Sequence, residues 1–499
     1  MSSHRLATAT ILTTGTETEP RVLLVERSRK LRFFGGYQAF PGGVIDAVDH
    51  DGEPWDALAH RRCAVRECFE EIGVLPTILR DALGPERLAD LRAGLLADDR
   101  EALLAFRAIL DAHPAALEGF TDVGVLTTPP FAPVRYRTQF LERRLPSDVQ
   151  PELQGGELSA WSIEAPHDIL RAFAQGERLI APPVLGLLDV LSRGDLATFR
   201  TAARTLCDEH ESGRLTRIRN APGIWMASLA TDTIPPATTT NTYLVGESEL
   251  WIVDPATPHA SEQERLFTLL EELVAEGRKL AGILVTHHHQ DHVGAVETTA
   301  RRFDLTVAAH ARTLERLPVT PQRSRELVDG ETIELGNAPD GSPDWNLTAY
   351  HTPGHDQGHL VFLDSRYRSL IAGDLCSTVS TIVIDPPEGH MQTYLDSLAR
   401  IRDLDIGLLH PAHGPVAPRG KRLIERYIAH RGEREQRLVD GLSDSEGRGI
   451  QALLDSVYPE VDSRIRPVAA RSLLAGLQKL QEERRAVLRD DAWFAITPS

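Results

Sequence analysis

Short apolar runs and amphipathic helical stretches divide the chain into three regions. In the first region, residues 1–212, the pattern predicts one strong helix near 58–72 and further helical stretches that end with 185–210. The strand-like runs of this region are TATILTTG, RVLLVERS, RYRTQFLERRL and LSAWSIE. A junction that contains glycine, ESGRLTRIRNAPG, leads into the second region.

The second region, residues 218–418, alternates apolar strands with amphipathic helices such as the one predicted over 262–280. Its strands are TNTYLVG, LWIVDPA, GILVTHHH, LTVAAH, LVFLD, SLIAGD and IGLLHPAHG. Such alternation is typical of layered α/β domains. The last region, 421–499, opens with a helical pattern over 421–442, and two more helical stretches are predicted, the last of them running over 471–496.

Composition limits the classes of protein to which the chain can belong. A chain of 499 residues is too long for one hydrophobic core, and 41% hydrophobic and 25% charged residues are ordinary for a globular protein. The net charge of −18 disfavours a nucleic-acid protein that is basic over its whole surface, although a local basic groove stays compatible with it. Four scattered cysteines are too few for a disulfide framework or a Cys-rich zinc site. Because neither a signal-type apolar segment nor a membrane-length run occurs, we expect a cytoplasmic protein without membrane contact.

Four histidines and an aspartate lie within one short loop, LVTHHHQDHVGA, residues 284–295. The preceding apolar run reads as a buried strand, and open α/β sheets place ligands at the carboxyl ends of such strands. Imidazole suits zinc, iron or manganese, and aspartate adds a hard oxygen ligand. So many ligands on one loop exceed the need of one ion and favour two. His355, Asp374 and His413 also lie just past strand-like runs and complete the set.

The pattern HxHxDH at 287–292, with TPGH, GD and AHG following in order, resembles the metallo-β-lactamase-fold hydrolases over residues 218–418. The resemblance implies an αββα sandwich with two Zn²⁺ ions, or Mn²⁺ or Fe. It assigns the ligands as follows: His287, His289 and His355 for one ion, Asp291, His292 and His413 for the other, and Asp374 bridging. His288, His351, His359, His390 and His410 fit no ligand position and are predicted to have packing roles.

A metal site of this kind predicts hydrolysis. Water held between two cations has a pKa lowered towards neutrality, and the cations polarise a carbonyl or phosphoryl oxygen. Asp291 or Asp374 can orient the attacking oxygen and is the predicted catalytic carboxylate. The expected reaction is cleavage of an ester-like bond, and export and β-lactam hydrolysis are disfavoured.

A second catalytic pattern, AVRECFEEIGV, occupies residues 64–74. Glu67, Glu70 and Glu71 share one face of the predicted helix, where mutual repulsion favours a bound Mg²⁺ or Mn²⁺, although a solvated acidic face is the alternative. The preceding FPGG places Gly42 and Gly43 where a backbone can approach a phosphate. Together these segments resemble the Nudix box of diphosphate hydrolases, an α/β/α sandwich with Glu67 and Glu70 as catalytic carboxylates.

The Nudix resemblance departs from the family pattern in front of the helix. Asp49 stands where a glutamate is usual, and an insertion around DHDGEPWDA separates the glycine loop from the helix. Further upstream, LLVERSRKLRFFGGYQAFPGG resembles the signature of Nudix enzymes that split coenzyme A, with Val25 where threonine is usual. Arg27 and Arg32 would then bind phosphate, or else they are ordinary surface arginines at a strand end.

The C-terminal region resembles the small winged-helix tail of a metallo-β-lactamase-fold branch that includes LACTB2-like single-strand endoribonucleases. Its basic and acidic residues are nearly balanced in an otherwise acidic chain, which is weak support for contact with RNA. Alternatively the tail only covers the hydrolase and shapes its cleft.

Two hypotheses of different classes follow. In the first, an α/β multidomain enzyme joins a Nudix diphosphatase for CoA or nucleotide derivatives to a binuclear hydrolase of single-stranded RNA or of thioesters. In the second, the Nudix region binds such a small molecule without cutting it and regulates the attached hydrolase.

Overall fold

The computed structural model describes residues 4–31, 34–145, 150–215, 217–459 and 461–496. The chain forms two compact units, residues 1–222 and 223–499. No helix in the described part of the chain combines the length and the apolar character that a membrane crossing requires. The domain limits expected from the sequence, 1–212, 218–418 and 421–499, stay predictions.

The first unit contains an eight-stranded mixed sheet with the strand order β5-β6-β1-β2-β3-β8. Two further strands leave this path, because β4 pairs with β1 and β7 pairs with β2. The strands are β1 (Arg5–Gly15), β2 (Pro20–Arg27), β3 (Tyr37–Ala39), β4 (Gly42–Val44), β5 (Phe120–Thr127), β6 (Tyr136–Arg144), β7 (Leu158–Glu164) and β8 (Leu179–Ile180). A short strand, β9 (Ile218–Ala221), ends the unit.

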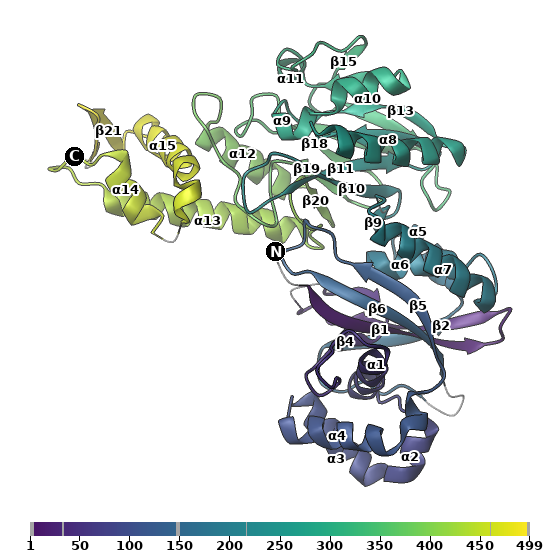
Figure 1. Cartoon of the computed structure of the whole chain (residues 1–499). Coiled ribbons are helices and arrows are strands. Elements are labelled where there is room, and N and C mark those ends of the chain that lie inside the picture. The colour runs from purple at the N-terminus through teal and green to yellow at the C-terminus, as the bar shows by residue number, and fades with distance from the viewer. Residues whose placement is uncertain (1–3, 32–33, 146–149, 216, 460, 497–499) are drawn as a thin grey trace. The chain divides into compact units, whose positions relative to one another are not determined.

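Helices cover both faces of this sheet (Figure 1). Successive residues of a strand point to opposite faces, so Ile11 and Leu24 pack under helices on one side while Leu12 and Leu23 pack on the other. The first side is covered by α5 (Pro166–Ala174), α6 (Pro182–Leu191) and α7 (Leu196–Glu211), and the second by α1 (Ala57–Ile72). The result is an α/β/α sandwich, and α1 is the helix predicted near 58–72.

A small helical layer packs on the outer side of α1. It contains α2 (Thr77–Leu83), α3 (Pro85–Leu96), α4 (Arg100–Ala112) and the 3₁₀ turn η1 (Pro114–Leu117). Phe106 of α4 stacks on Phe69 of α1, with ring centroids 5.7 Å apart. This contact fixes the face of α1 that turns away from the sheet.

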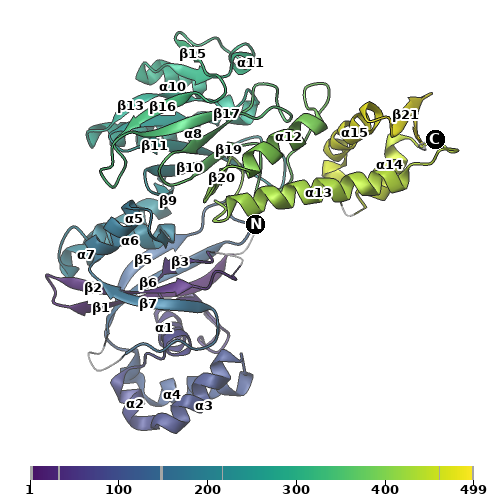
Figure 2. The same cartoon turned by 180° about the vertical axis from the view of Figure 1, so that it is seen from behind.

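The second unit contains two sheets with helices outside them, an αββα arrangement (Figures 1 and 2). In the first sheet the order is β15-β14-β13-β12-β11-β10, and in the second it is β16-β17-β18-β19-β20. The first-sheet strands are β10 (Ile224–Ala230), β11 (Thr239–Gly246), β12 (Glu249–Val253), β13 (Lys279–Leu284), β14 (Val307–Ala309) and β15 (Ser324–Glu326). The second-sheet strands are β16 (Thr332–Gly336), β17 (Trp345–His351), β18 (Leu360–Asp364), β19 (Leu370–Gly373) and β20 (Leu409–Pro411). The helices are α8 (Ala260–Ala275), α9 (Gln290–Val293), α10 (Val296–Phe303), α11 (Ala311–Leu314) and α12 (Met391–Arg402).

The C-terminal domain is a small winged helix. It is formed by α13 (Gly420–Gly441), α14 (Ile450–Val457), the turn η2 (Ser463–Ile465), α15 (Arg466–Glu482), β21 (Ala486–Arg489) and β22 (Ala492–Ala495). Leu438, Leu453, Leu477 and Trp493 share one core. The helical stretch predicted over 471–496 is wrong after Glu482. The last residues form a β-hairpin instead, because Asp490 and Asp491 both adopt positive φ and reverse the chain between two short apolar strands.

Candidate metal centres

The side chains proposed as metal ligands in the second unit lie in segments that follow strands, and two of them, Asp291 and His292, belong to the short helix α9. His287, His289, Asp291 and His292 come after β13, and His355 follows β17. Asp374 and His413 follow β19 and β20, which are parallel neighbours in the second sheet. Three compact sets of ligand atoms result, each within 4.8 Å: His287 with His289 and His355, His287 with His292 and Asp374, and Asp291 with His292 and His413. The structure therefore brings all seven residues together.

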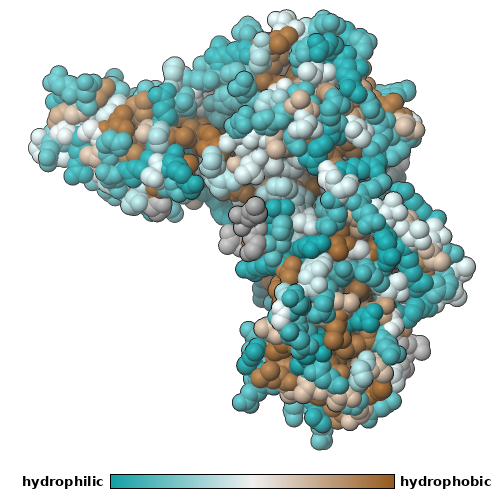
Figure 3. Space-filling view, in the orientation of Figure 1, coloured by the Kyte–Doolittle hydropathy of each residue, from teal (hydrophilic) through white to brown (hydrophobic). Residues whose placement is uncertain are grey.

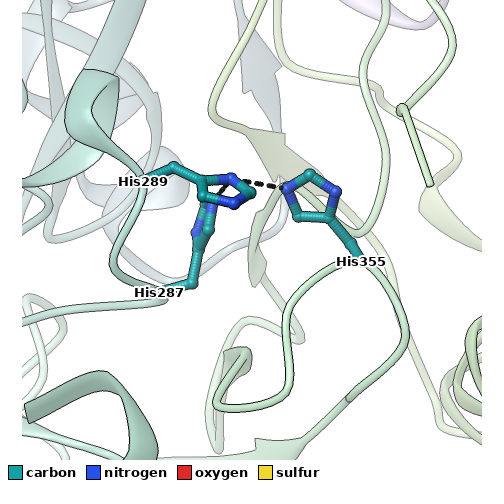
Figure 4. Close-up of side chains that lie close together, drawn as sticks. All are labelled: His287, His289 and His355. Carbon is teal, nitrogen blue, oxygen red and sulfur yellow. Dashed lines mark hydrogen bonds between the residues drawn. The ribbon is translucent and has the colours of Figure 1, made fainter. Parts of the chain in front are cut away.

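The first set is a group of three imidazoles (Figure 4). The Nδ1 atom of His289 lies 3.0 Å from the Nε2 atoms of both His287 and His355. The Nδ1 atom of His355 lies 2.7 Å from the carbonyl oxygen of Val383, so it must donate a hydrogen. The Nε2 lone pair of His355 is thereby left facing the other two rings.

Asp374 lies between the three imidazoles of the first set and the pair His292 and His413. The Nε2 atoms of His413 and His292 lie 3.4 and 3.5 Å from Oδ1 of Asp374, whereas Nε2 of His355 lies 3.5 Å from its Oδ2. Oδ2 of Asp291 lies 3.5 Å from Nε2 of His413. One carboxylate thus faces both groups of histidines with different oxygens.

Asp254, at the end of β12, orients two of these histidines and was missed in the sequence. Its Oδ2 accepts hydrogen bonds from Nδ1 of His292 at 2.9 Å and from the hydroxyl of Thr286 at 2.6 Å, and its Oδ1 accepts one from the Thr286 backbone N–H at 2.8 Å. Because the Thr286 hydroxyl donates to Asp254, its oxygen accepts from Nδ1 of His287 at 3.0 Å. Both histidines therefore point Nε2 into the site. The available signal was the DPA turn directly after an apolar strand.

Burial and neighbouring charges shift the pKa values of this site in opposite directions. Burial, followed by the adjacent histidines, lowers the pKa of His355 to about 4 and holds that of His287 well below its usual range. Burial also lowers the pKa of His292, but Asp374 and Asp254 outweigh it and raise the value well above normal. Burial opposes ionisation of Asp374, yet His413 and His292 hold its pKa well below the usual range. In the chain alone, the site therefore combines neutral imidazoles at His287 and His355 with a protonated imidazole at His292 and an ionised carboxylate at Asp374.

The donor set fits divalent cations. Nε2 of His292 and Oδ1 of Asp374 are buried and have no hydrogen-bond partner in the described chain, although both point into the site. Buried polar atoms are normally satisfied, and a cation between them would satisfy both. Neutral imidazoles with aspartate oxygens are the ligands that Zn²⁺ prefers, and Mn²⁺ and Fe accept them too.

Five further histidines that fit no ligand position in the sequence make other contacts. His359 accepts a hydrogen bond from the Asp374 N–H at 3.0 Å and so positions that carboxylate. His288 lies 2.6 Å from Asp356 and belongs to a further ligand-like group with His289 and Glu388 at the edge of the site. The other three lie elsewhere: His351 against the carbonyl of Gln357, His390 at the start of α12, and His410 against the ring of Tyr243.

The glutamates of α1 face the glycine loop in the first unit. Glu71 accepts a hydrogen bond from the Gly42 N–H at 3.0 Å. A Cβ atom at Gly43 would lie 2.4 Å from Oε1 of Glu67, so any larger residue would displace this carboxylate. The ligand-like sets found among the described residues do not include the three glutamates. Their carboxylates are neighbours without forming a compact set.

The glutamates are crowded by like charges and by burial. Burial, with the charge of Glu67, raises the pKa of Glu70 to about 7 and that of Glu71 to about 8. Arg66 donates to Glu67 at 2.8 Å and binds Asp49 through two hydrogen bonds of 3.1 and 2.8 Å. Asp49, which replaces the usual glutamate, is thus a buried partner of Arg66. A cation would relieve the remaining repulsion, so the acidic face fits Mg²⁺ or Mn²⁺.

The predicted phosphate-binding arginines are described only in part. The charge of Arg27 lowers the pKa of Glu71, which places this guanidinium beside the acidic face, and its Nε is buried without a hydrogen-bond partner in the described chain. Arg32 lies outside the described residues.

Comparison with known families agrees with this architecture. The NUDIX domain model matches residues 3–114, the metallo-beta-lactamase superfamily model matches 235–413, and the beta-lactamase associated winged helix domain model matches 450–493. NUDIX and metallo-beta-lactamase proteins are both hydrolase families.

Individual relatives match about half of the chain. Beta-lactamase-like protein 2 homolog of Drosophila melanogaster is 29% identical over 277 residues, 52% of this chain and 89% of the relative. An atrochrysone carboxyl ACP thioesterase of Aspergillus fumigatus is 24% identical over 302 residues, 56% of this chain and 67% of the relative. The crystal structure of a beta-lactamase domain protein from Burkholderia ambifaria shares the fold, with a TM-score of 0.50 and 17% identity over 56% of this chain and 93% of its own. The chain is therefore a multidomain hydrolase that joins a NUDIX domain, a metallo-beta-lactamase superfamily domain and a beta-lactamase associated winged helix domain.

Proposed function

We propose that the second unit is a binuclear metal-dependent hydrolase. His287, His289 and His355 would hold one cation, and Asp291, His292 and His413 the other. The observation that carries this proposal is the position of Asp374, whose two oxygens lie 3.4–3.5 Å from histidines of both sets. Metal analysis tests it: we expect two equivalents of zinc, manganese or iron per chain and fewer in the Asp374→Ala variant. Equal occupancy in the two proteins would contradict the proposal.

Bound cations would supply Lewis acidity and a water acidic enough to attack at neutral pH. The chain itself supplies orientation and charge. The carbonyl of Val383 and the carboxylate of Asp254 fix the tautomers of His355 and His292. Asp291 is more exposed than Asp374, with 20% against 13% of the side chain accessible, and is therefore the better placed of the two carboxylates to meet the attacking oxygen.

The substrate bond that we favour is a thioester of a CoA-type or carrier-linked acyl group. The similarity to a protein named as an acyl-carrier thioesterase supports it. The CoA-like signature of residues 23–43 supports a shared ligand for the two hydrolase domains. The test offers the metal-loaded protein an acyl-CoA and a single-stranded RNA in parallel. Thiol release without RNA cleavage is expected.

Cleavage of single-stranded RNA is the second candidate. Its support is the winged helix, which resembles the tail of an endoribonuclease branch, together with the suitability of a two-cation site for displacement at phosphorus. RNA cleavage without thiol release in the parallel assay would favour this candidate over the thioester. If the protein catalyses neither reaction, both candidates are contradicted.

For the first unit we propose hydrolysis of a diphosphate, with Glu67, Glu70 and Glu71 holding Mg²⁺ or Mn²⁺. These carboxylates are crowded, and a bound cation would relieve their repulsion. Together with the close approach of Gly43 to Glu67, this crowding supports a cation and a phosphate at this face. Glu70→Gln should lower diphosphate hydrolysis by about 100-fold, whereas Glu86→Gln, an exposed carboxylate on α3, should not. Hydrolysis that survives Glu70→Gln would contradict the assignment. If the wild type cuts no diphosphate but a CoA-type ligand changes the second activity, the regulatory hypothesis replaces it.

A further inference from the structure

The loop over residues 380–390 carries the group that orients His355. It connects the region after β19 to α12, and residues 381–390 form neither helix nor strand. Within it, the carbonyl oxygen of Val383 accepts the hydrogen bond from Nδ1 of His355 at 2.7 Å. The direction of the His355 imidazole therefore depends on where this loop holds one backbone carbonyl.

Helices of the C-terminal region hold the backbone on both sides of Val383. Ser472, on α15, accepts a hydrogen bond from the Ile384 N–H through its hydroxyl oxygen at 3.0 Å. Arg431, on α13, donates from Nη2 to the carbonyl of Ile382. Both side chains are buried, with 8% and 6% of the residue exposed, so water does not compete for these hydrogen bonds.

The rest of the loop is attached to α15 as well. Arg471 contacts the carboxylate of Asp385 and donates to the carbonyl of Pro386 at 2.6 Å. At the end of the loop, His390 lies 3.0 Å from Glu482, in the last turn of α15. These contacts are more exposed and individually weak, but they extend the attachment along the whole loop.

A small crevice lies beside Ser472. It has a volume of about 30 Å³ and lies between α12, α13, α14 and α15. Arg431, Ser472, Met391 and Leu473 line it. Figure 3 shows hydrophobic residues gathered over α15 towards α12.

We infer that Ser472 and Arg431 are positioning residues for His355, and that the winged-helix region thereby sets the affinity of the His287–His289–His355 group for its cation. This inference rests on the proposed binuclear site. The second group, Asp291, His292 and His413, has its own supports in Asp254 and in the carbonyl of Thr239, which lies 3.0 Å from Nδ1 of His413. Loss of the Ser472 hydrogen bond should therefore weaken one group and spare the other.

The test measures Zn²⁺ affinity by competition with a chromophoric chelator, on the full chain. Ser472→Ala is introduced into the wild type, into His413→Ala, which retains the first group, and into His289→Ala, which retains the second. We expect about tenfold weaker binding in the His413→Ala background, as for other partners behind a ligand, and no change in the His289→Ala background. A changed Co²⁺ absorption spectrum in the first background would report the altered ligand geometry independently.

Two controls separate positioning from general damage. Ser472→Thr keeps the acceptor oxygen and should restore the affinity. Ser456→Ala removes a hydroxyl that bonds only within the C-terminal domain, to Leu453, and should bind zinc as the wild type does. Unchanged affinity in folded Ser472→Ala, or equal weakening of both groups, would overturn the inference. A wild type that binds fewer than two ions would instead overturn the proposed function on which it depends.

Discussion

Replacement of Asp254 by asparagine tests whether this residue, which lies behind the ligands, sets the tautomer of His292 and with it the metal affinity of the Asp291–His292–His413 group. The aspartate is 2% exposed and accepts three hydrogen bonds, two from Thr286 and one from Nδ1 of His292. Asparagine has the same shape but one acceptor oxygen and one amide donor. If the oxygen stays with the Thr286 N–H, the amide faces Nδ1 of His292 and turns it into an acceptor. The proton of His292 then moves to Nε2, which can no longer bind a cation.

The expected magnitudes follow from these contacts. A hydrogen bond to a charged acceptor contributes about 1.5–3 kcal/mol. Because asparagine keeps one of the three, we expect the free energy of unfolding to fall by about 3 kcal/mol. Loss of the partner behind a metal-bound histidine typically weakens metal affinity about 10–100-fold. We therefore expect stoichiometry to fall below two ions when zinc is limiting, with the larger loss in the Asp291–His292–His413 group, because Asp254 contacts His292 directly and reaches His287 only through Thr286.

Chelator competition and thermal unfolding are measured on the same preparations. Asp364→Asn is the matched control, because Asp364 is also 2% exposed and accepts hydrogen bonds from Trp345 Nε1 and the Ser369 N–H, both at 2.7 Å, but belongs to neither metal group. The control should lose stability and keep both zinc affinities. If Asp254→Asn also binds two ions with wild-type affinity, the claim that Asp254 sets the tautomer of His292 is refuted.

Two further predictions concern the acidic face of α1. The pKa of Glu71 is raised to about 8 in the folded protein, so its protonated form contributes stability that is complete below the unfolded value and is lost as pH rises through about 8. Without divalent cations, the unfolding midpoint of the first unit should fall by about 4 °C between pH 5.5 and 8.5. Mg²⁺ should raise the unfolding midpoint again, chiefly at pH 8.5. Glu71→Gln should remove most of the difference between the midpoints at the two pH values, and an unchanged pH dependence in this variant would contradict the role of Glu71. Gly43→Ala places a Cβ against Glu67 and should weaken Mg²⁺ binding measured by calorimetry, while Gly156→Ala, with open space around its Cβ position, should not. Equal Mg²⁺ binding in the two variants would show that the Gly43–Glu67 contact is not part of the cation site.

Local pattern was sufficient to locate the candidate ligands, because each of them lies shortly after a strand. The apolar run before His287 forms β13, and SLIAG forms β19 directly before Asp374. Parallel neighbours such as β19 and β20 end at the same edge of a sheet, so residues that follow them converge whatever the intervening sequence does. Helix α1 could be predicted equally well, because its apolar and acidic positions repeat with helical spacing over one uninterrupted stretch.

The elements that were missed depend on partners distant in the sequence. The DPA turn marks the position of Asp254, but its role depends on Thr286 and His292, which are 32 and 38 residues away. The hairpin at 486–495 was read as helix because AVL and AWFA are apolar enough for either structure. The two aspartates at positive φ, Asp490 and Asp491, decide between them. The identity of these two residues alone does not predict the turn, whereas the pairing of the two strands on either side of it shows the turn directly.

The C-terminal helices show why the metal-binding domain and the winged helix form one functional structure in the second unit. The first half of α13 contributes Leu423, Ile424 and Tyr427 to the core beneath α12, whereas Leu438, near its end, belongs to the winged-helix core. A helix that is part of two cores transmits displacement between them, because packed interiors have little free volume in which to absorb it. Tyr427 extends this link towards the site: its hydroxyl accepts from the Ser377 N–H at 2.8 Å, three residues after Asp374. Whatever the winged helix binds, its effect on hydrolysis can therefore pass through the positions of the metal ligands and need not involve contact with the substrate.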